Sequence, residues 1–139
     1  MSEQFNWKFT IQVVGGPTMA ASGEQVIDAY SKSQIKVPAH SGGTDGEVVL
    51  ALNTTGASIL AIRASQYIDP NNTTNSLQYA ITSGGVVGTA AKMTGPIIMI
   101  GESSIRLLGN PVEMVTFTNP IESEITIDTL VGRDATSTP

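Results

Sequence analysis

The stretch from Phe5 to Val13 alternates apolar and polar residues without a break. A period of two places successive side chains on opposite faces of a β-strand, whereas the apolar face of a helix repeats every three or four residues. One face of this segment therefore carries only large apolar side chains. They are Phe5, Trp7, Phe9, Ile11 and Val13. The alternation predicts that the fold begins with a β-strand, here expected over residues 5–14.

Weaker alternation recurs along the rest of the chain, between clusters of glycine, proline and asparagine. Residues 20–30 fit either a short helix, with Ser22 and Gln25 as a capping box, or a strand, and residues 86–93 fit no single state. We expect 34–38 to be a short edge strand that ends at a proline, and 58–68 to lie near the centre of a sheet. The other expected strands are 47–52, 77–81, 96–100, 104–108, 112–118 and 125–131.

The spacing of these segments indicates the fold class. Turn signals recur roughly every ten residues, which is typical of an antiparallel β-sandwich and not of βαβ units. We therefore predict an all-β chain, a single-domain antiparallel β-sandwich or jelly-roll-like fold of roughly nine to ten short strands. A length of 139 residues fits one domain. The predicted organisation is an N-terminal arm at 1–4, a β-sandwich domain at 5–131 and a C-terminal tail at 132–139.

Charge and cysteine content exclude several classes of partner. The net charge of −5 opposes binding to nucleic acid or to anionic membranes, and the basic residues are spread singly. Without cysteine the chain has no disulfide framework and no thiolate metal site. Residues 1–4 do not resemble a signal peptide, and the longest apolar run, 97–100, is too short to span a membrane. We expect a soluble protein made in a cytoplasm.

The residues that usually perform chemistry are scarce. His40 is the single histidine, and it lies in a glycine-rich loop beside Ser41 and near Asp45. These three residues are of the types that form a Ser/His/Asp triad, but a flexible glycine-rich loop would hold the geometry of a triad poorly. We therefore expect an exposed loop histidine, no catalytic residue and no enzymatic activity.

The acidic residues and glycine clusters give no stronger signal. Residues 44–47 could supply a few oxygen ligands to calcium, but the spacing of a calcium-binding loop is absent. The other acidic residues are scattered, so a pair of glycosidase carboxylates is not indicated. The glycines at 84–88 and 42–46 lack the spacing of phosphate-binding loops and are better explained as turns. We expect no metal and no cofactor.

The apolar face of the first strand has two interpretations. It can close the core of the sandwich, which is the interpretation we favour. Alternatively, this strand can pair with or pack on another subunit, because terminal strands are common vehicles of strand exchange. In that case Phe5, Trp7, Phe9, Ile11 and Val13 form the candidate interface.

Several features together resemble small structural proteins of tailed-bacteriophage virions, in particular capsid decoration (cement) proteins. They are the short β-segments, the surface rich in Thr, Asn, Gly and Ser, the absence of cysteine and the closing stretch ITIDTLVGRDAT at 125–136. The resemblance implies a β-sandwich in the virion that forms a dimer or trimer. Its partner would be the major capsid protein, and it would stabilise the shell from outside at contacts between capsomers.

A carbohydrate-binding or receptor-binding β-sandwich, lectin-like or tail-fibre-like, is the alternative from another functional class. Such modules bind sugars on exposed aromatic side chains. The candidates for this role are Trp7, Tyr30, Tyr67 and Tyr79. This small number of aromatic residues weighs against the alternative.

Overall fold

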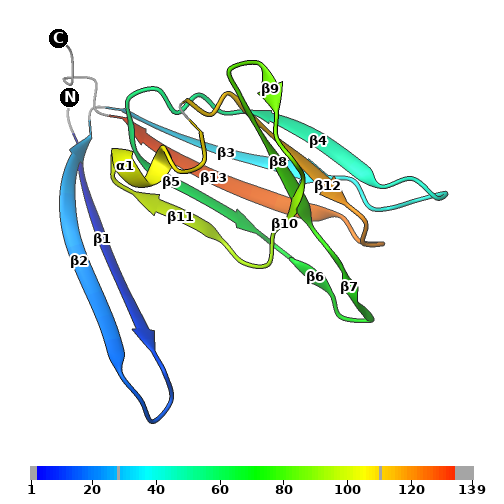
Figure 1. Cartoon of the computed structure of the whole chain (residues 1–139), viewed down its shortest axis with the longest axis horizontal. Coiled ribbons are helices and arrows are strands. Elements are labelled where there is room, and N and C mark those ends of the chain that lie inside the picture. Colours follow the sequence, from blue (N-terminus) through cyan, green and yellow to red (C-terminus); the bar gives the residue numbers. More distant parts are fainter. Residues whose placement is uncertain (1–2, 28, 110, 134–139) are drawn as a thin grey trace.

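The computed structural model describes residues 3–27, 29–109 and 111–133, and most of them lie in antiparallel β-strands (Figure 1). Within these residues the single helix is one short turn, α1 (Glu102–Ile105). The strands in chain order are β1 (Glu3–Gln12), β2 (Thr18–Ile27), β3 (Ala29–Val37), β4 (Gly46–Ala51), β5 (Ala57–Ala64), β6 (Ile68–Asp69), β7 (Asn72–Ser76), β8 (Gln78–Ser83), β9 (Val86–Val87), β10 (Ala91–Lys92), β11 (Ile97–Ile100), β12 (Met114–Asn119) and β13 (Ile125–Arg133).

Two sheets form a β-sandwich, which confirms the predicted fold class. One sheet has the order β11-β5-β13-β3, and the other has the order β10-β8-β12-β4 with β9 paired to β8. The described residues form more strands than the nine or ten expected. The excess comes mainly from β6, β9 and β10, which are two residues long and too short to leave a periodic signal.

The core lies between the two sheets and is made by alternate residues of their inner faces. Phe117 of β12 is fully buried, and its neighbours across the strands are Val48 of β4 and Tyr79 of β8. In the facing sheet, Leu60 and Ile62 of β5 point inward. The expectation that the run at 58–68 lies centrally is confirmed for β5, which pairs with β11 on one side and β13 on the other.

The first two strands leave the sandwich. β1 and β2 pair with each other over ten residues each and form a two-stranded sheet of their own. Figure 1 shows this hairpin projecting from one end of the sandwich, at the corner from which β3 departs. We call the hairpin, residues 3–27, the arm. Residues 20–27 thus form a strand of the arm, and the helical interpretation of 20–30 is wrong.

Two further expectations need correction. The strand expected at 104–108 is wrong, because the backbone N–H groups of Ile105 and Arg106 donate to the carbonyl groups of Gly101 and Glu102 and close the turn of α1. The edge strand expected at 34–38 is the end of a longer edge strand, β3, that begins at Ala29.

The strands at both ends of the chain also cross the predicted domain boundaries. β1 begins at Glu3, inside the expected N-terminal arm at 1–4, and β13 runs to Arg133, inside the expected tail at 132–139. Residues 1–2 and 134–139 lie outside the described residues.

Candidate interaction surface

The arm has one apolar and one polar face. Residues directly opposite each other in an antiparallel pair share a face, and Trp7 lies opposite Gly23, Phe9 opposite Ala21 and Ile11 opposite Met19. The alternation of β1 is therefore continued across β2. We call the resulting surface the apolar arm face. It consists of Phe5, Trp7, Phe9, Ile11, Met19, Ala21 and Gly23.

An aromatic pair lies near the middle of this face. The rings of Trp7 and Phe9 are stacked, with centroids 6.2 Å apart and ring planes 15° from parallel. The indole of Trp7 lies over Gly23, where a Cβ atom would come within 2.6 Å of the indole Cζ2. The missing side chain at Gly23 thus makes room for the largest side chain of the arm.

The tip of the arm is a tight turn. The N–H of Gly16 donates to the carbonyl of Val13 at 2.7 Å, and Gly15 has a φ of 74°. A positive φ at the third position of a four-residue turn is the conformation for which glycine is favoured. Val14, which occupies the second position, is 98 % exposed. The outermost part of the arm is therefore apolar and uncovered.

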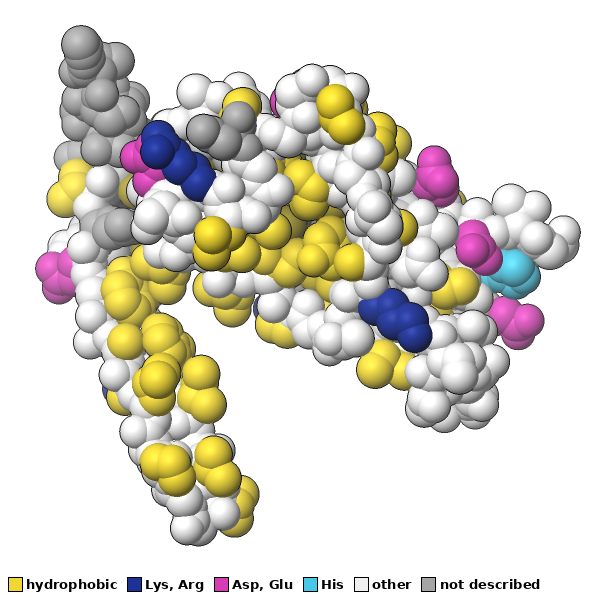
Figure 2. Space-filling view, in the orientation of Figure 1, with side chains coloured by type: hydrophobic (Ala, Val, Ile, Leu, Met, Phe, Trp, Pro, Cys, Tyr) yellow, Lys and Arg dark blue, Asp and Glu magenta, His cyan; other side chains and the backbone are white. Residues whose placement is uncertain are grey.

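A groove of about 740 Å³ separates the arm from the sandwich. Its arm side is formed by β1, from Phe5 to Ile11. Its other side is the outer face of the four-stranded sheet near α1, and it too is apolar. We call these sheet residues the sheet wall; they are Ile59 and Ala61 of β5 and Ile98 and Ile100 of β11. Figure 2 shows hydrophobic side chains following the arm along its length, on the side toward the sandwich.

The structure brings the predicted interface residues together but not in the core. Phe5, Trp7, Phe9 and Ile11 share the apolar arm face, whereas Val13 lies beyond the end of β1. Ile11 and Val13 are both 58 % exposed, and none of the five belongs to the hydrophobic core of the sandwich. The favoured interpretation, in which this strand closes the core, is therefore wrong. Their role as an interface remains a prediction.

Sequence reasoning missed the half of this surface that β2 contributes. Met19 is 63 % exposed and lies on the apolar arm face with Ala21. The alternation in β2 is weak because its apolar face includes the small residues Ala21 and Gly23. The glycine pair before Pro17 was the available signal, since a turn between two alternating segments indicates a hairpin.

The residues considered for catalysis lie at the other end of the sandwich. His40 Nδ1 and Asp45 Oδ1 are 2.7 Å apart, and both side chains are partly exposed. Within the described residues, Asp45 is the hydrogen-bonding partner of the His40 ring, and no serine hydroxyl bonds to it. The pair therefore has the histidine and carboxylate of a triad without a positioned nucleophile.

Acidic side chains also surround this end of the sandwich. His40, Asp45, Asp69 and Glu122 line a groove of about 490 Å³. Within the described ranges, no group of three or more histidine or acidic side chains is placed to hold a metal ion.

The glycines at 84 and 85 have φ values of 62° and 76°, as expected for a turn between β8 and β9.

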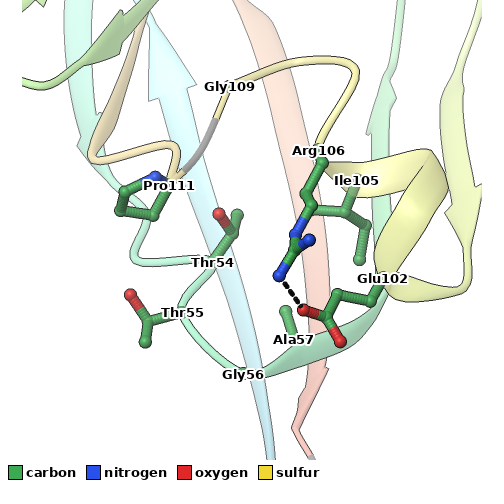
Figure 3. A pocket seen from close by; sticks show the side chains of 9 residues that line it. All are labelled: Thr54, Thr55, Gly56, Ala57, Glu102, Ile105, Arg106, Gly109 and Pro111. Carbon is green, nitrogen blue, oxygen red and sulfur yellow. Dashed lines mark hydrogen bonds and ion pairs between the residues drawn. The ribbon is translucent and has the colours of Figure 1, made fainter.

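A smaller pocket of about 260 Å³ lies beside α1. Figure 3 shows Glu102 and Arg106 pointing toward each other at its mouth, and their side chains form an ion pair at 2.5 Å. Thr54 lines the same pocket, and its hydroxyl accepts a hydrogen bond from the N–H of Val112 at 2.9 Å. Glu102, Arg106 and the hydroxyl of Thr54 thus have partners within the chain, as in a structural contact.

The aromatic residues considered for sugar binding differ in their surroundings. Tyr67 and Tyr79 are half-buried and pack against the core, and the hydroxyl of Tyr67 accepts a hydrogen bond from the N–H of Ala64 at 3.0 Å. Tyr30 is exposed on the outer face of β3, and Trp7 stacks on Phe9 within the arm. These four residues do not form one platform.

The outer face of the four-stranded sheet becomes polar away from the sheet wall. Asp128 of β13 accepts hydrogen bonds from Gln34 at 2.8 Å and from Arg63 at 2.9 Å. The hydrogen bond from Gln34, the one from Arg63 and the positive charges of Arg63 and Lys32 lower the pKa of Asp128 below its usual value. The apolar sheet wall is therefore bordered by polar side chains that bond to one another, with the charge of Asp128 paired to that of Arg63.

No protein-family model, curated protein or solved structure matches this chain. Within the described part of the chain, no helix is long and apolar enough to cross a membrane.

Proposed function

We propose that this protein is a non-enzymatic structural protein that forms oligomers and binds the outside of a phage capsid. In this role it stabilises the shell at contacts between capsomers. The single observation that carries the proposal is the arm, a projecting hairpin whose large apolar side chains between Phe9 and Met19 are exposed. The capsid as the site of assembly rests on the resemblance of the sequence to decoration proteins.

The physical chemistry of the arm supports an assembly role. An isolated two-stranded hairpin is marginally stable in water, because it cannot bury enough apolar surface to offset its conformational entropy. Contiguous exposed apolar surface on a folded protein marks contacts with other molecules. The arm combines both properties, since it pairs with no further described strand and exposes Ile11, Val14 and Met19. A partner that covers the apolar arm face would stabilise the hairpin and hold the subunit in place.

A shell provides the setting in which such a contact is effective. Subunits bound in many copies next to one another gain avidity, so a modest contact for each copy is sufficient. The sandwich supplies a rigid body with a continuous core, and the arm supplies the part that can reach a neighbour. The carbohydrate-binding alternative is less well supported, because Tyr67 and Tyr79 pack against the core.

Co-sedimentation with empty shells tests the proposal. The shells are assembled from the major capsid protein encoded in the same genome, mixed with the purified chain and pelleted. We expect saturable binding and a higher temperature of shell disassembly, with an unrelated acidic protein of similar size remaining in the supernatant. If the chain also remains in the supernatant at micromolar concentration, the capsid role is wrong. Binding to a glycan array in that case would support the alternative.

A further inference from the structure

We propose that the arm closes on its own sandwich and brings the stacked rings of Trp7 and Phe9 onto the exposed part of the sheet wall at Ile98. In the structure the arm stands open, and closing it fills the groove of about 740 Å³ with side chains of the same chain. The inference goes beyond the proposed function, because it concerns a single chain and needs no partner.

The base of the arm is already in contact with the sandwich. Ile27, at the end of β2, lies on the same face of that strand as Gly23 and is only 3 % exposed. A Cβ atom on Gly132 of β13 would come within 3.3 Å of Ile27 Cδ1 and 3.5 Å of Ile59 Cβ. Ile59, which belongs to the sheet wall, is 2 % exposed. The missing side chain at Gly132 thus leaves a place for Ile27 on the sheet, which we call the seat of the arm.

The groove widens like a wedge from this seat. On the arm, Trp7 is half-buried, Phe9 is 39 % exposed and Ile11 is 58 % exposed. On β11, Ile100 is half-buried and Ile98, farther from the seat, is 64 % exposed. Figure 2 shows the open space between arm and sandwich with hydrophobic side chains on both sides. Two apolar surfaces therefore diverge from a point of contact, and closing the wedge would remove apolar area from water, which is favourable.

No directional contact holds the arm open. Among the described residues, no backbone hydrogen bond and no ion pair joins the arm to the sandwich. The contact of Ile27 at the seat is apolar, and apolar contacts are non-directional. The arm can therefore turn about the seat while the hydrogen bonds of the hairpin stay intact. It exchanges between the open position of the structure and a closed position.

The size and charge of the two surfaces suit a contact within one chain. The apolar arm face has seven residues and the sheet wall has four, whereas a specific interface between separate molecules takes roughly 20–30 residues from each partner. A contact within one chain avoids the loss of translational and rotational freedom that association requires. Among the described residues that line the groove, Lys8 is the charged one. Closure therefore brings no like charges of the groove together.

Closure divides the arm into two parts. The part from Phe5 to Phe9 lines the groove opposite the sheet wall, whereas Val14 and Met19 at the tip do not line it. In the closed position the aromatic pair is shielded from non-specific contacts, and the tip stays free to meet a partner. The closed arm lies on the outer face of the four-stranded sheet and adds no side chain to the core between the sheets.

A disulfide within one chain tests the closure, because the natural chain has no cysteine. Phe9→Cys and Ile98→Cys are combined in one chain, which is oxidised at low concentration and analysed by mass spectrometry of the linked peptides. The control chain combines Ile98→Cys with Thr10→Cys, on the polar face of β1. We expect the link between positions 9 and 98 to form within single chains, at a rate independent of protein concentration. This rate should be at least about tenfold that of the link between 10 and 98, because closure raises the effective concentration of the two thiols.

Equal rates for the two links, or links only between separate chains, overturn the closure. If Phe9→Cys changes the circular dichroism, acrylamide quenching of Trp7 replaces the disulfide. Ile98→Asp places a charge on the sheet wall and should raise the quenching constant about twofold, since a charge opposes apolar contact. Val49→Asp, on the outer face of the other sheet, is the control and should leave the constant unchanged. Equal constants for the two variants also overturn the closure. Both experiments use the free chain, so the capsid role is judged separately by co-sedimentation with shells.

Discussion

The indole ring of Trp7 occupies the space that a side chain at position 23 would fill. The two residues lie directly opposite each other in the arm, and a Cβ atom on Gly23 would come within 2.6 Å of Cζ2 and 2.8 Å of Cε2 of the ring. This contact fixes the position of the ring and allows it to stack on Phe9. Because Trp7 is the only tryptophan, its fluorescence reports on the arm alone.

Substituting Gly23→Ala should therefore change the tryptophan emission. The new methyl group displaces the indole from the strand and from Phe9, so we expect an emission shifted to the red. The free energy of unfolding of the sandwich should change by less than about 0.5 kcal/mol, because the substitution lies outside the core. Ser22→Ala, on the polar face of the same strand, is the control. An emission spectrum of Gly23→Ala identical to that of the natural protein would contradict the observed packing.

Trp7→Ala tests whether the first strand belongs to the core. We expect it to change the free energy of unfolding of the monomer by less than about 1 kcal/mol, because the arm packs outside the sandwich. Phe117→Ala, which removes a fully buried ring, should cost about 3–5 kcal/mol. Urea denaturation followed by far-ultraviolet circular dichroism at low protein concentration measures both. If Trp7→Ala and Phe117→Ala lowered the free energy of unfolding equally, Trp7 would belong to the core.

Asn119 makes a buried polar anchor at the end of β12. Its side-chain nitrogen donates to the carbonyls of Pro38 at 3.1 Å and Ser123 at 2.8 Å, and its oxygen accepts from the N–H of Ile121 at 2.9 Å. Asn119→Ala leaves these buried groups without their partner, so we expect a loss of about 3 kcal/mol in unfolding free energy. Thermal or urea unfolding measures the loss.

Asn53→Ala is the matched control for Asn119→Ala. The Asn53 side chain also accepts a hydrogen bond from a backbone N–H, that of Thr55 at 2.9 Å, but at an exposed site. Water replaces the lost partner there, so the expected cost is below about 1 kcal/mol. If Asn119→Ala and Asn53→Ala lost the same unfolding free energy, the burial of Asn119 would not explain the loss at that position.

The lowered pKa of Asp128 predicts a dependence of stability on pH. Hydrogen bonds from Gln34 and Arg63 favour the carboxylate in the folded protein, so its pKa lies below the usual value of 3.8. The resulting stabilisation is present above about pH 4 and is lost as the pH falls through the folded-state pKa. Asp128→Asn should therefore lower the free energy of unfolding at neutral pH. In strong acid, the difference in unfolding free energy between the variant and the natural protein should become smaller.

Denaturation at several pH values and nuclear magnetic resonance titration check this prediction. Removing the larger contribution, with Gln34→Ala, should raise the pKa of Asp128 toward its usual value. A carboxyl group at position 128 that titrates at or above its usual pKa in the natural protein would show that the network does not favour the charged form.

Most strands could be predicted from the sequence because their side chains alternate or form bounded apolar runs. β4, β8, β12 and β13 lie within one or two residues of the expected segments, and β5 is central as expected. The segment at 104–108 could not be predicted, because its apolar residues do not distinguish a strand from a short turn of helix. The deciding interactions there are the backbone bonds of α1 and the ion pair between Glu102 and Arg106.

The place of the first strand could not be predicted for a different reason. A period of two shows which side chains share a face, but it does not show what covers that face. Phe5 to Ile11 would give the same pattern in a sandwich core and in a projecting hairpin. The distinction depends on the pairing of β1 with β2 alone, which is a property of the whole fold. Similarly, the approach of Asp45 to His40 depends on the path of a loop that has no periodic signal.

The solution mass of two arm variants tests most directly whether the arm joins subunits. Ile11→Asp places a charge on the apolar arm face, whereas Thr10→Asp places the same charge on the polar face of the same strand. In sedimentation equilibrium over a range of concentrations, the natural protein and Thr10→Asp should reach at least twice the chain mass of 14.5 kDa. Ile11→Asp should remain a folded monomer, because a charge buried in an apolar contact is strongly unfavourable. A natural protein that stays monomeric, or an Ile11→Asp variant that associates equally well, would contradict an assembly role for the arm.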